Sequence, residues 1–220
     1  MQNQTLKQLI ENRGQRYSQI LHIDVSHGKN SEIFKWFLAS ILFGAPIRDS
    51  TAIKTYKNFE ECDVLTPERI VETGWDGLVK ILDEGGYARY DFKTADKILE
   101  VMRHLIDGYD GDLNVLHEAS ANADDLEKRL KALGKGIGDV TVNIFLRELR
   151  GVWSKANPKP TSLVILAAQT LGIVKEKATP KESLAQLKVF WQKNRMPGKS
   201  FIDFETALFR KGKELRSKRK

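Results

Sequence analysis

The chain has 220 residues, of which 41% are hydrophobic and 30% are charged, a composition typical of soluble globular proteins. It contains no run of about 18 apolar residues, so we expect no transmembrane helix and no membrane partner. The first 30 residues lack the apolar core of a secretory signal. The single cysteine, Cys62, excludes an internal disulfide and a cysteine-ligated zinc or iron–sulfur cluster, and we expect a cytoplasmic protein.

The formal net charge of +7 suggests a polyanionic partner. Most of this charge lies at the carboxyl end, because the last eleven residues hold seven basic side chains and one acidic one, which leaves +1 for residues 1–209. The basic tail, residues 210–220, either adds salt-dependent affinity for nucleic acid or is a frayed solubilising end. The sequence leaves both interpretations open.

Hydrophobic periodicity predicts an all-α chain of roughly ten helices, with no convincing strand. The segment 31–43 is apolar nearly all round, which predicts the buried centre of a helical domain, and it ends at Gly44-Ala45-Pro46. His22 and His27 lack a neighbouring third ligand and are interpreted as surface or capping residues. Helices are predicted at 3–12, 31–43, 48–62, 67–74, 75–82, 91–106, 125–133, 140–149, 162–171, 180–194 and 201–213, with a short turn at 113–117.

Three alternate glycines, Gly134, Gly136 and Gly138, separate two of these helices. The pattern predicts a tight turn whose backbone N–H groups, at the start of the second helix, can hold a phosphate oxygen. A dinucleotide-binding fingerprint would follow a strand, and a P-loop would end in Gly-Lys-Ser or Gly-Lys-Thr; neither condition is met. A turn between helices that binds no ligand remains the alternative.

The order of several segments narrows this choice. G-W-D-G-L-V-K-I-L is followed by K-T-A-D-K-I-L-E-V, L-E-K-R-L-K-A-L and G-I-G-D-V-T-V-N-I-F-L. Over residues 30–158 this succession resembles the helix-hairpin-helix superfamily of base-excision DNA glycosylases, specifically the endonuclease III-like branch. The resemblance implies two interleaved helical domains: a six-helix-barrel-like domain at 30–141 that ends in the hairpin, and a second domain formed by 1–29 and 142–220.

The resemblance also implies a partner, double-stranded DNA that is damaged or distorted, and a base flipped out of the duplex. It places the phosphate-contacting turn at Lys135, Gly136, Ile137 and Gly138, with Thr141 at the start of the second helix. In this family, hairpin carbonyls often hold a monovalent cation, which here implicates Gly134 and Gly136. We expect a monomer with no iron–sulfur cluster, associated with the nucleoid if the source is bacterial or archaeal.

Three further positions are candidates for contacts with DNA. Arg48 lies in the loop where the family often carries a gap-filling glutamine, and it is expected to fill that gap or contact phosphate. Tyr87 and Tyr90 flank Arg89 in a glycine-led loop. Their rings are candidates for stacking on a flipped base, with packing in the core as the alternative.

The catalytic positions depart from the family pattern. Val140 occupies the place of the lysine, so a Schiff base at that position is excluded and any activity would be that of a monofunctional glycosylase. Pro158, or Asn157 after a one-residue shift, occupies the place of the aspartate, and the nearest carboxylates by position are Asp139 and Asp49. Each is alternatively a helix-start residue. The sequence therefore supports two hypotheses, a divergent DNA glycosylase and a DNA-binding module without activity, beside a plain helical interaction protein.

Overall fold

The computed structural model describes residues 2–218, with residues 2 and 3 described by their backbone alone. This part of the chain forms twelve α-helices and no β-strand, so the predicted all-α class is confirmed. The chain divides into two compact units. We call Leu21–Pro158 the central unit, and Met1–Ile20 together with Lys159–Lys220 the terminal unit. No helix of residues 2–218 is long and apolar enough to cross a membrane.

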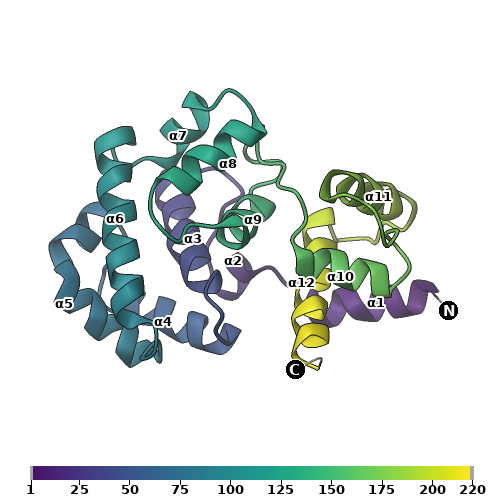
Figure 1. Cartoon of the computed structure of the whole chain (residues 1–220), viewed down its shortest axis with the longest axis horizontal. Helices are drawn as coiled ribbons and strands as arrows, with labels where there is room; N and C mark the ends of the chain where they lie inside the picture. Colours follow the sequence, from purple (N-terminus) through teal and green to yellow (C-terminus); the bar gives the residue numbers. More distant parts are fainter. Residues whose placement is uncertain (1, 219–220) are drawn as a thin grey trace. The chain divides into compact units, whose positions relative to one another are not determined.

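The central unit is built around α3 (Asn30–Phe43), which packs against α4 (Asp49–Glu61), α7 (Leu113–Ala119) and α9 (Asp139–Glu148) (Figure 1). Ten of the fourteen residues of α3 are buried, as the nearly uniform apolar sequence predicts. The indole Nε1 of Trp36 donates a hydrogen bond of 3.0 Å to the carbonyl of Phe145, which fixes α9 against the central helix.

The helices α5 (Pro67–Gly85) and α6 (Asp91–Tyr109) pack along each other (Figure 1). Two helices were predicted where α5 lies, with a break at Gly74. The structure joins them into one element, but Gly74 keeps non-helical torsions (φ 67°, ψ −178°) that glycine adopts readily, so the predicted break is a kink. After α7 the chain enters α8 (Ala123–Ala132), whose amino end is capped by the side chain of Asn122.

The terminal unit combines helices from both ends of the chain. Its last helix, α12 (Phe201–Ser217), lies beside α1 (Gln2–Arg13) and α10 (Ser162–Thr170) (Figure 1). At Gly212, α12 comes so close to α10 that an added β-carbon would overlap the carbonyl of Leu163. The short helix α2 was not predicted. The helices of this unit are α1 (Gln2–Arg13), α2 (Tyr17–Ile20), α10 (Ser162–Thr170), α11 (Pro180–Lys193) and α12 (Phe201–Ser217).

The basic segment predicted at 210–220 begins inside α12 and is helical as far as residue 217, because the helix continues four residues past its predicted end at 213. The Arg210 guanidinium lies 4.3 Å from the ring centre of Tyr17 and donates to the carbonyl of Arg13 at 3.0 Å. Residues 210–217 are therefore part of the fold, and residues 219 and 220 lie outside the described range.

The unit boundaries differ from those predicted at 29/30 and 141/142. They fall instead at 20/21 and 158/159. The segment 21–29 belongs to the central unit, where Asn114 Nδ2 donates to the carbonyl of Gly28 at 3.2 Å. The segment 142–158 stays there as well, because α9 packs on α3. A glycine turn is a visible break in the sequence, but here the two helices that it joins share one core.

Candidate nucleic-acid interface

The glycine turn comprises residues 133–138 and connects α8 to α9. Gly136 has a φ of 87°, a left-handed conformation that a residue with a side chain adopts only at a cost. The N–H of Ile137 donates to the carbonyl of Gly134 at 3.2 Å, and the Ile137 side chain is 4% exposed. The turn is thus closed by its own backbone and anchored by two buried apolar side chains, those of Leu133 and Ile137.

One face of α6 supports this turn through residues at i, i+3, i+4 and i+7. Val101 lies against Gly134, where an added β-carbon would come within 2.7 Å of its Cγ2 atom. Glu100 Oε2 accepts a hydrogen bond of 3.1 Å from the Lys135 backbone N–H, and His104 Nδ1 lies 2.8 Å from the carbonyl oxygen of Leu133. The fourth residue is Lys97. Spacing of this kind places all four side chains on one side of a helix.

The amine of Lys97 lies beside the glycine turn. A β-carbon placed on Gly136 would lie 2.6 Å from Lys97 Cε and 3.2 Å from its Nζ. The side chain is half-buried, and this burial lowers the pKa of its ammonium group. Within residues 4–218 it forms no hydrogen bond or ion pair. A cation without a counter-ion therefore lies next to the turn.

The amino end of α9 follows directly. Gly138 is the N-cap residue and supplies no side-chain cap, and the next two residues, Asp139 and Val140, are exposed. The first intrahelical bond across the cap runs from the Val142 N–H to the Gly138 carbonyl, at 3.0 Å. The N–H groups before Val142 have no acceptor within the helix, and together with the helix dipole they favour an anion here.

The carboxylate of Asp139 lies at the same helix end. Its side chain is 86% exposed, and its Oδ1 atom forms an ion pair of 2.5 Å with Lys131 Nζ. This position agrees with that of an acidic residue in the first turn of a helix, where the dipole favours negative charge. The other carboxylate candidate, Asp49, lies in the first turn of α4 and is half-buried.

The loop after α3 meets the start of α9. Thr141 is 4% exposed, and its Oγ1 atom would overlap a β-carbon at Gly44, so these two residues are in direct contact. The structure thus gives Thr141 a packing position. Arg48, four residues beyond Gly44, precedes α4 with an exposed side chain.

The two tyrosines proposed for stacking lie in different environments. Tyr87 is 1% exposed, and its hydroxyl donates a short hydrogen bond to the carbonyl of Leu42 in α3. Burial raises the pKa of this phenol well above its usual range. Tyr90 is half-buried and lies 5.9 Å from the Arg89 guanidinium. Of the pair, Tyr87 is a core residue, and Tyr90 reaches the surface.

Other residues occupy the positions where the DNA glycosylases that the sequence resembles have their catalytic lysine and aspartate. Val140 is 41% exposed at the surface of α9. Arg150 binds both residues at the aspartate position: Nη1 donates to Asn157 Oδ1 at 2.8 Å, and Nη2 donates to the Pro158 carbonyl at 2.7 Å. This guanidinium closes the segment that follows α9, so Asn157 and Pro158 have a structural role there.

The residues considered for metal binding are dispersed. His22, His27 and Cys62 are exposed, and residues 2–218 contain no cluster of three or more His, Cys, Asp or Glu side chains suited to a metal ion. The Gly134 carbonyl, implicated in a monovalent cation site, already accepts the Ile137 N–H. A cation held by the carbonyls of Gly134 and Gly136 remains a prediction.

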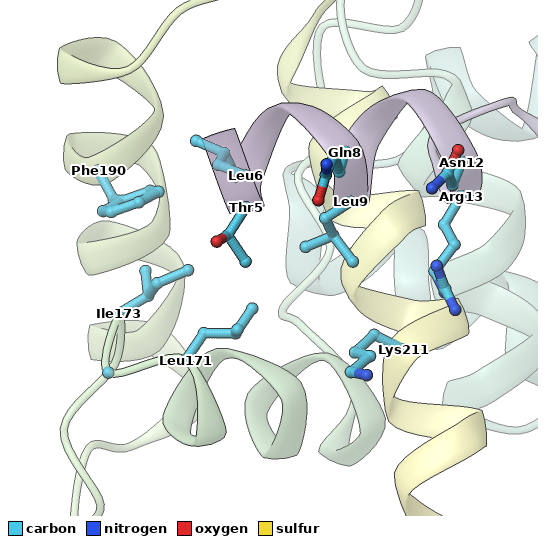
Figure 2. A pocket seen from close by; sticks show the side chains of 11 residues that line it. Thr5, Leu6, Gln8, Leu9, Asn12, Arg13, Leu171, Ile173, Phe190 and Lys211 are labelled. Carbon is cyan, nitrogen blue, oxygen red and sulfur yellow. The ribbon is translucent and has the colours of Figure 1, made fainter. Parts of the chain in front are cut away.

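The terminal unit contains two pockets that the sequence did not indicate. An apolar pocket of about 430 Å³ lies among α1, α10, α11 and α12, with Phe190 and Ile173 on one side and Arg13 and Lys211 on the other (Figure 2). Arg13 is bound to Glu214 through its Nε and Nη2 atoms, at 2.8 and 2.6 Å. A second pocket, of about 530 Å³, shares Leu6 with the first and is lined mainly by polar residues.

The charge of the chain is unequally divided between the units. The central unit has 18 Lys and Arg against 23 Asp and Glu, a net charge of −5. The terminal unit has 18 basic against 6 acidic side chains, a net charge of +12, and the two values add to the +7 of the chain. The glycine turn therefore belongs to the acidic unit, where an anion must be attracted by local groups.

No protein-family model matches the sequence, and no curated protein is significantly similar to it.

Proposed function

We propose that the chain binds double-stranded DNA, damaged or otherwise distorted, through the glycine turn and the amino end of α9. The observation that carries this proposal is the position of the half-buried Lys97 ammonium beside Gly136, next to an uncapped helix start. Backbone N–H groups and a cation are the groups that proteins use to bind a phosphodiester irrespective of base sequence. Such a contact fixes the position of the duplex, as an enzyme that flips a base requires.

The resemblance to endonuclease III-like DNA glycosylases supports the same ligand and suggests a role in base-excision repair. By that resemblance the damaged base leaves the duplex and enters a cleft while the turn holds the phosphates. Arg48, which is exposed, and Tyr90, which is half-buried, are the candidates for contacts near the flipped nucleotide. Hydrolysis of the glycosidic bond in this scheme would depend on a carboxylate displaced from its usual position.

A catalytically inactive DNA-binding module is the second candidate function, and the environment of the catalytic positions favours it. Val140 supplies no amine, and Asn157 and Pro158 are both bound by Arg150. The nearby carboxylate of Asp139 is exposed and paired with Lys131. A general base normally needs a partly desolvated position that raises its pKa towards neutrality.

Binding is tested by fluorescence anisotropy with a labelled duplex that carries one abasic-site analogue, beside the intact duplex. We expect tighter binding to the distorted duplex. Lys97→Gln should weaken binding about tenfold to a hundredfold, the magnitude of one hydrogen bond to a charged group. Lys93→Gln is the matched control because Lys93 is an exposed lysine on the same helix, and it should change affinity by less than about twofold.

Gly138→Ala tests the helix end without disturbing the turn, because Gly138 has φ −105° and no atom lies within 4 Å of an added β-carbon. The methyl group should hinder the approach of a phosphate to the free N–H groups and weaken binding, while the melting temperature stays constant. Equal affinities for wild type, Gly138→Ala and Lys97→Gln would refute the phosphate-binding role of the turn.

Catalysis is tested separately by incubating the protein with duplexes that carry deaminated, oxidised or alkylated bases, followed by alkali to break abasic strands. Release of any base would establish the glycosylase, and Asp139→Asn and Asp49→Asn would then identify its carboxylate. Intact strands throughout the panel, together with binding to the abasic duplex, would establish the binding module.

A further inference from the structure

The second pocket of the terminal unit gathers basic side chains from two distant parts of the sequence. Lys193, Arg195 and Lys199 come from the end of α11 and the connection to α12, and Lys7 comes from α1. Glu11 is the one acidic residue among those that line the pocket. We call these four basic residues the basic cluster.

Three members of the cluster have no partner among the described residues. Lys193, Arg195 and Lys199 are exposed and form no side-chain hydrogen bond or ion pair within residues 4–218, and Lys7 forms only a long ion pair of 3.8 Å with Glu11. In the neighbouring apolar pocket, by contrast, Arg13 and Lys211 both pair with Glu214. Unpaired like charges around one concavity repel one another, and an anion seated among them removes that repulsion.

The fold fixes the backbone segment that carries three of these cations. Trp191 is 7% exposed and stacks on Phe204 at 5.6 Å, and Asn194 Nδ2 donates to the Phe190 carbonyl at 2.8 Å. After the turn, Ser200 begins α12 with a capping box that includes Asp203. The connection that carries Arg195 and Lys199 is thus fixed at both ends, so the cluster is part of the fold.

We infer that the basic cluster is a second nucleic-acid contact, which binds the phosphodiester backbone independently of the glycine turn. The terminal unit, with its charge of +12, would supply the long-range attraction that the acidic central unit cannot. The partner to which we commit is a duplex, because the closely spaced phosphates of its backbone carry the negative charge that the unpaired cations of the cluster lack, and an anionic membrane is an outcome of the test. No sequence preference is expected from such contacts.

The test uses the full chain and measures the salt dependence of its binding to an intact 20-base-pair duplex that carries no lesion. The triple variant Lys193→Gln, Arg195→Gln, Lys199→Gln removes three cations of the cluster. The control variant Lys175→Gln, Lys177→Gln, Lys181→Gln removes three exposed cations elsewhere in the same unit, so both variants lose the same net charge. Circular dichroism and thermal melting establish that both variants fold.

We expect the cluster variant to bind more than about tenfold more weakly at low salt. The slope of log K against log salt should become shallower by about 2–3, near 0.9 for each lost phosphate contact. The control should change the affinity by less than about threefold. Equal effects of the two variants would overturn the inference, because they would show that net charge alone matters. Unchanged duplex binding, combined with lost binding to phosphatidylserine vesicles, would overturn it in favour of a membrane.

The same titration with Lys97→Gln separates this inference from the proposed function. If the cluster acts alone, the cluster variant weakens binding and Lys97→Gln does not, which refutes the role of the glycine turn and leaves the cluster in place. If only the turn acts, the pattern is reversed and the inference fails.

Discussion

The side chain of Lys97 occupies the space that a β-carbon on Gly136 would need, with Cε 2.6 Å from that position. Two residues 39 positions apart therefore constrain each other. Glycine is favoured at 136 by its φ of 87°, and a side chain there would displace the flexible end of Lys97. The methylene stem of Lys97 also places its amine beside the glycine turn.

Replacing Gly136 by alanine is expected to destabilise the protein by about 1–3 kcal/mol, because the left-handed conformation and the contact with Lys97 both oppose a methyl group. Urea unfolding measures this change. The double variant Gly136→Ala, Lys97→Ala should recover part of the loss, since only the steric contact is relieved. Gly138→Ala is the control, and its free energy of unfolding should lie within about 0.5 kcal/mol of the wild-type value. A loss as large at Gly138 as at Gly136 would contradict the conformational argument.

Asp139→Asn is expected to strengthen DNA binding about twofold to fivefold at low salt. The exposed carboxylate lies at the helix end where a phosphate is proposed to bind, and its removal also frees Lys131. Anisotropy titrations at two ionic strengths check this, and the gain should shrink at high salt. Asp124→Asn, in the first turn of α8, is a control with the same charge change. Weaker binding by Asp139→Asn would argue for a direct role of the carboxylate.

Stability is expected to fall as the pH rises above about 10, the ordinary pKa of tyrosine. Burial raises the pKa of both Tyr87 and Tyr56 in the folded chain, so the unfolded chain releases their protons first. Their contribution to stability is complete below pH 10 and is lost as the pH rises towards the folded-state values, by up to about 1.4 kcal/mol per pH unit for each. Tyr87→Phe should reduce this slope in denaturant titrations from pH 9 to 11.5.

The same substitution removes the hydrogen bond from Tyr87 to the Leu42 carbonyl, so at pH 7 it should cost about 1–2 kcal/mol. Tyr90→Phe, at a half-buried position, is the comparison for the loss of one phenol hydroxyl at pH 7 and should cost less than Tyr87→Phe. An unaltered slope in Tyr87→Phe would show that another group controls the alkaline transition.

Asn157→Asp is expected to stabilise the protein by about 0.5–1 kcal/mol at pH 7, because the bond to Arg150 becomes an exposed ion pair. Arg150→Gln should cost about 1–3 kcal/mol, since two acceptors lose their donor. Thermal melting checks both. Stabilisation by Asn157→Asp that persists in an Arg150→Gln background would show that Arg150 is not the partner responsible.

The sequence predicted most of the helices because their apolar spacing and end signals agree locally. Thr66-Pro67 begins α5, Ser200 with Asp203 begins α12, and the uniformly apolar α3 forms the buried centre. Short α2 was missed because four residues are too few to show a helical period. The unit boundaries were also missed, because packing of α9 on α3 is a tertiary relationship without a local signal.

For the candidate site, the sequence indicated the glycine turn but not the residues of α6 that contact it. The residues Lys97, Glu100, Val101 and His104 do follow helical spacing. They were overlooked because the apolar residues Ile98, Leu99 and Leu105 dominate the periodicity of α6, and a mixed polar stripe resembles a solvated face. For Tyr87 the sequence left base stacking and core packing open, because a tyrosine suits both environments, and only the fold shows its hydroxyl bonded to Leu42.

The ion pair between Arg13 and Glu214 joins residues that are 201 positions apart in the sequence. During synthesis on the ribosome, α1 emerges first and its packing partner α12 emerges last, whereas every helix of the central unit is made in one uninterrupted stretch. The central unit can therefore fold while translation continues, and α1 must remain exposed until the final helix is released. A ribosome stalled before residue 201 would hold a central unit that can fold beside an α1 whose three apolar residues, Leu6, Leu9 and Ile10, lack their α12 partner.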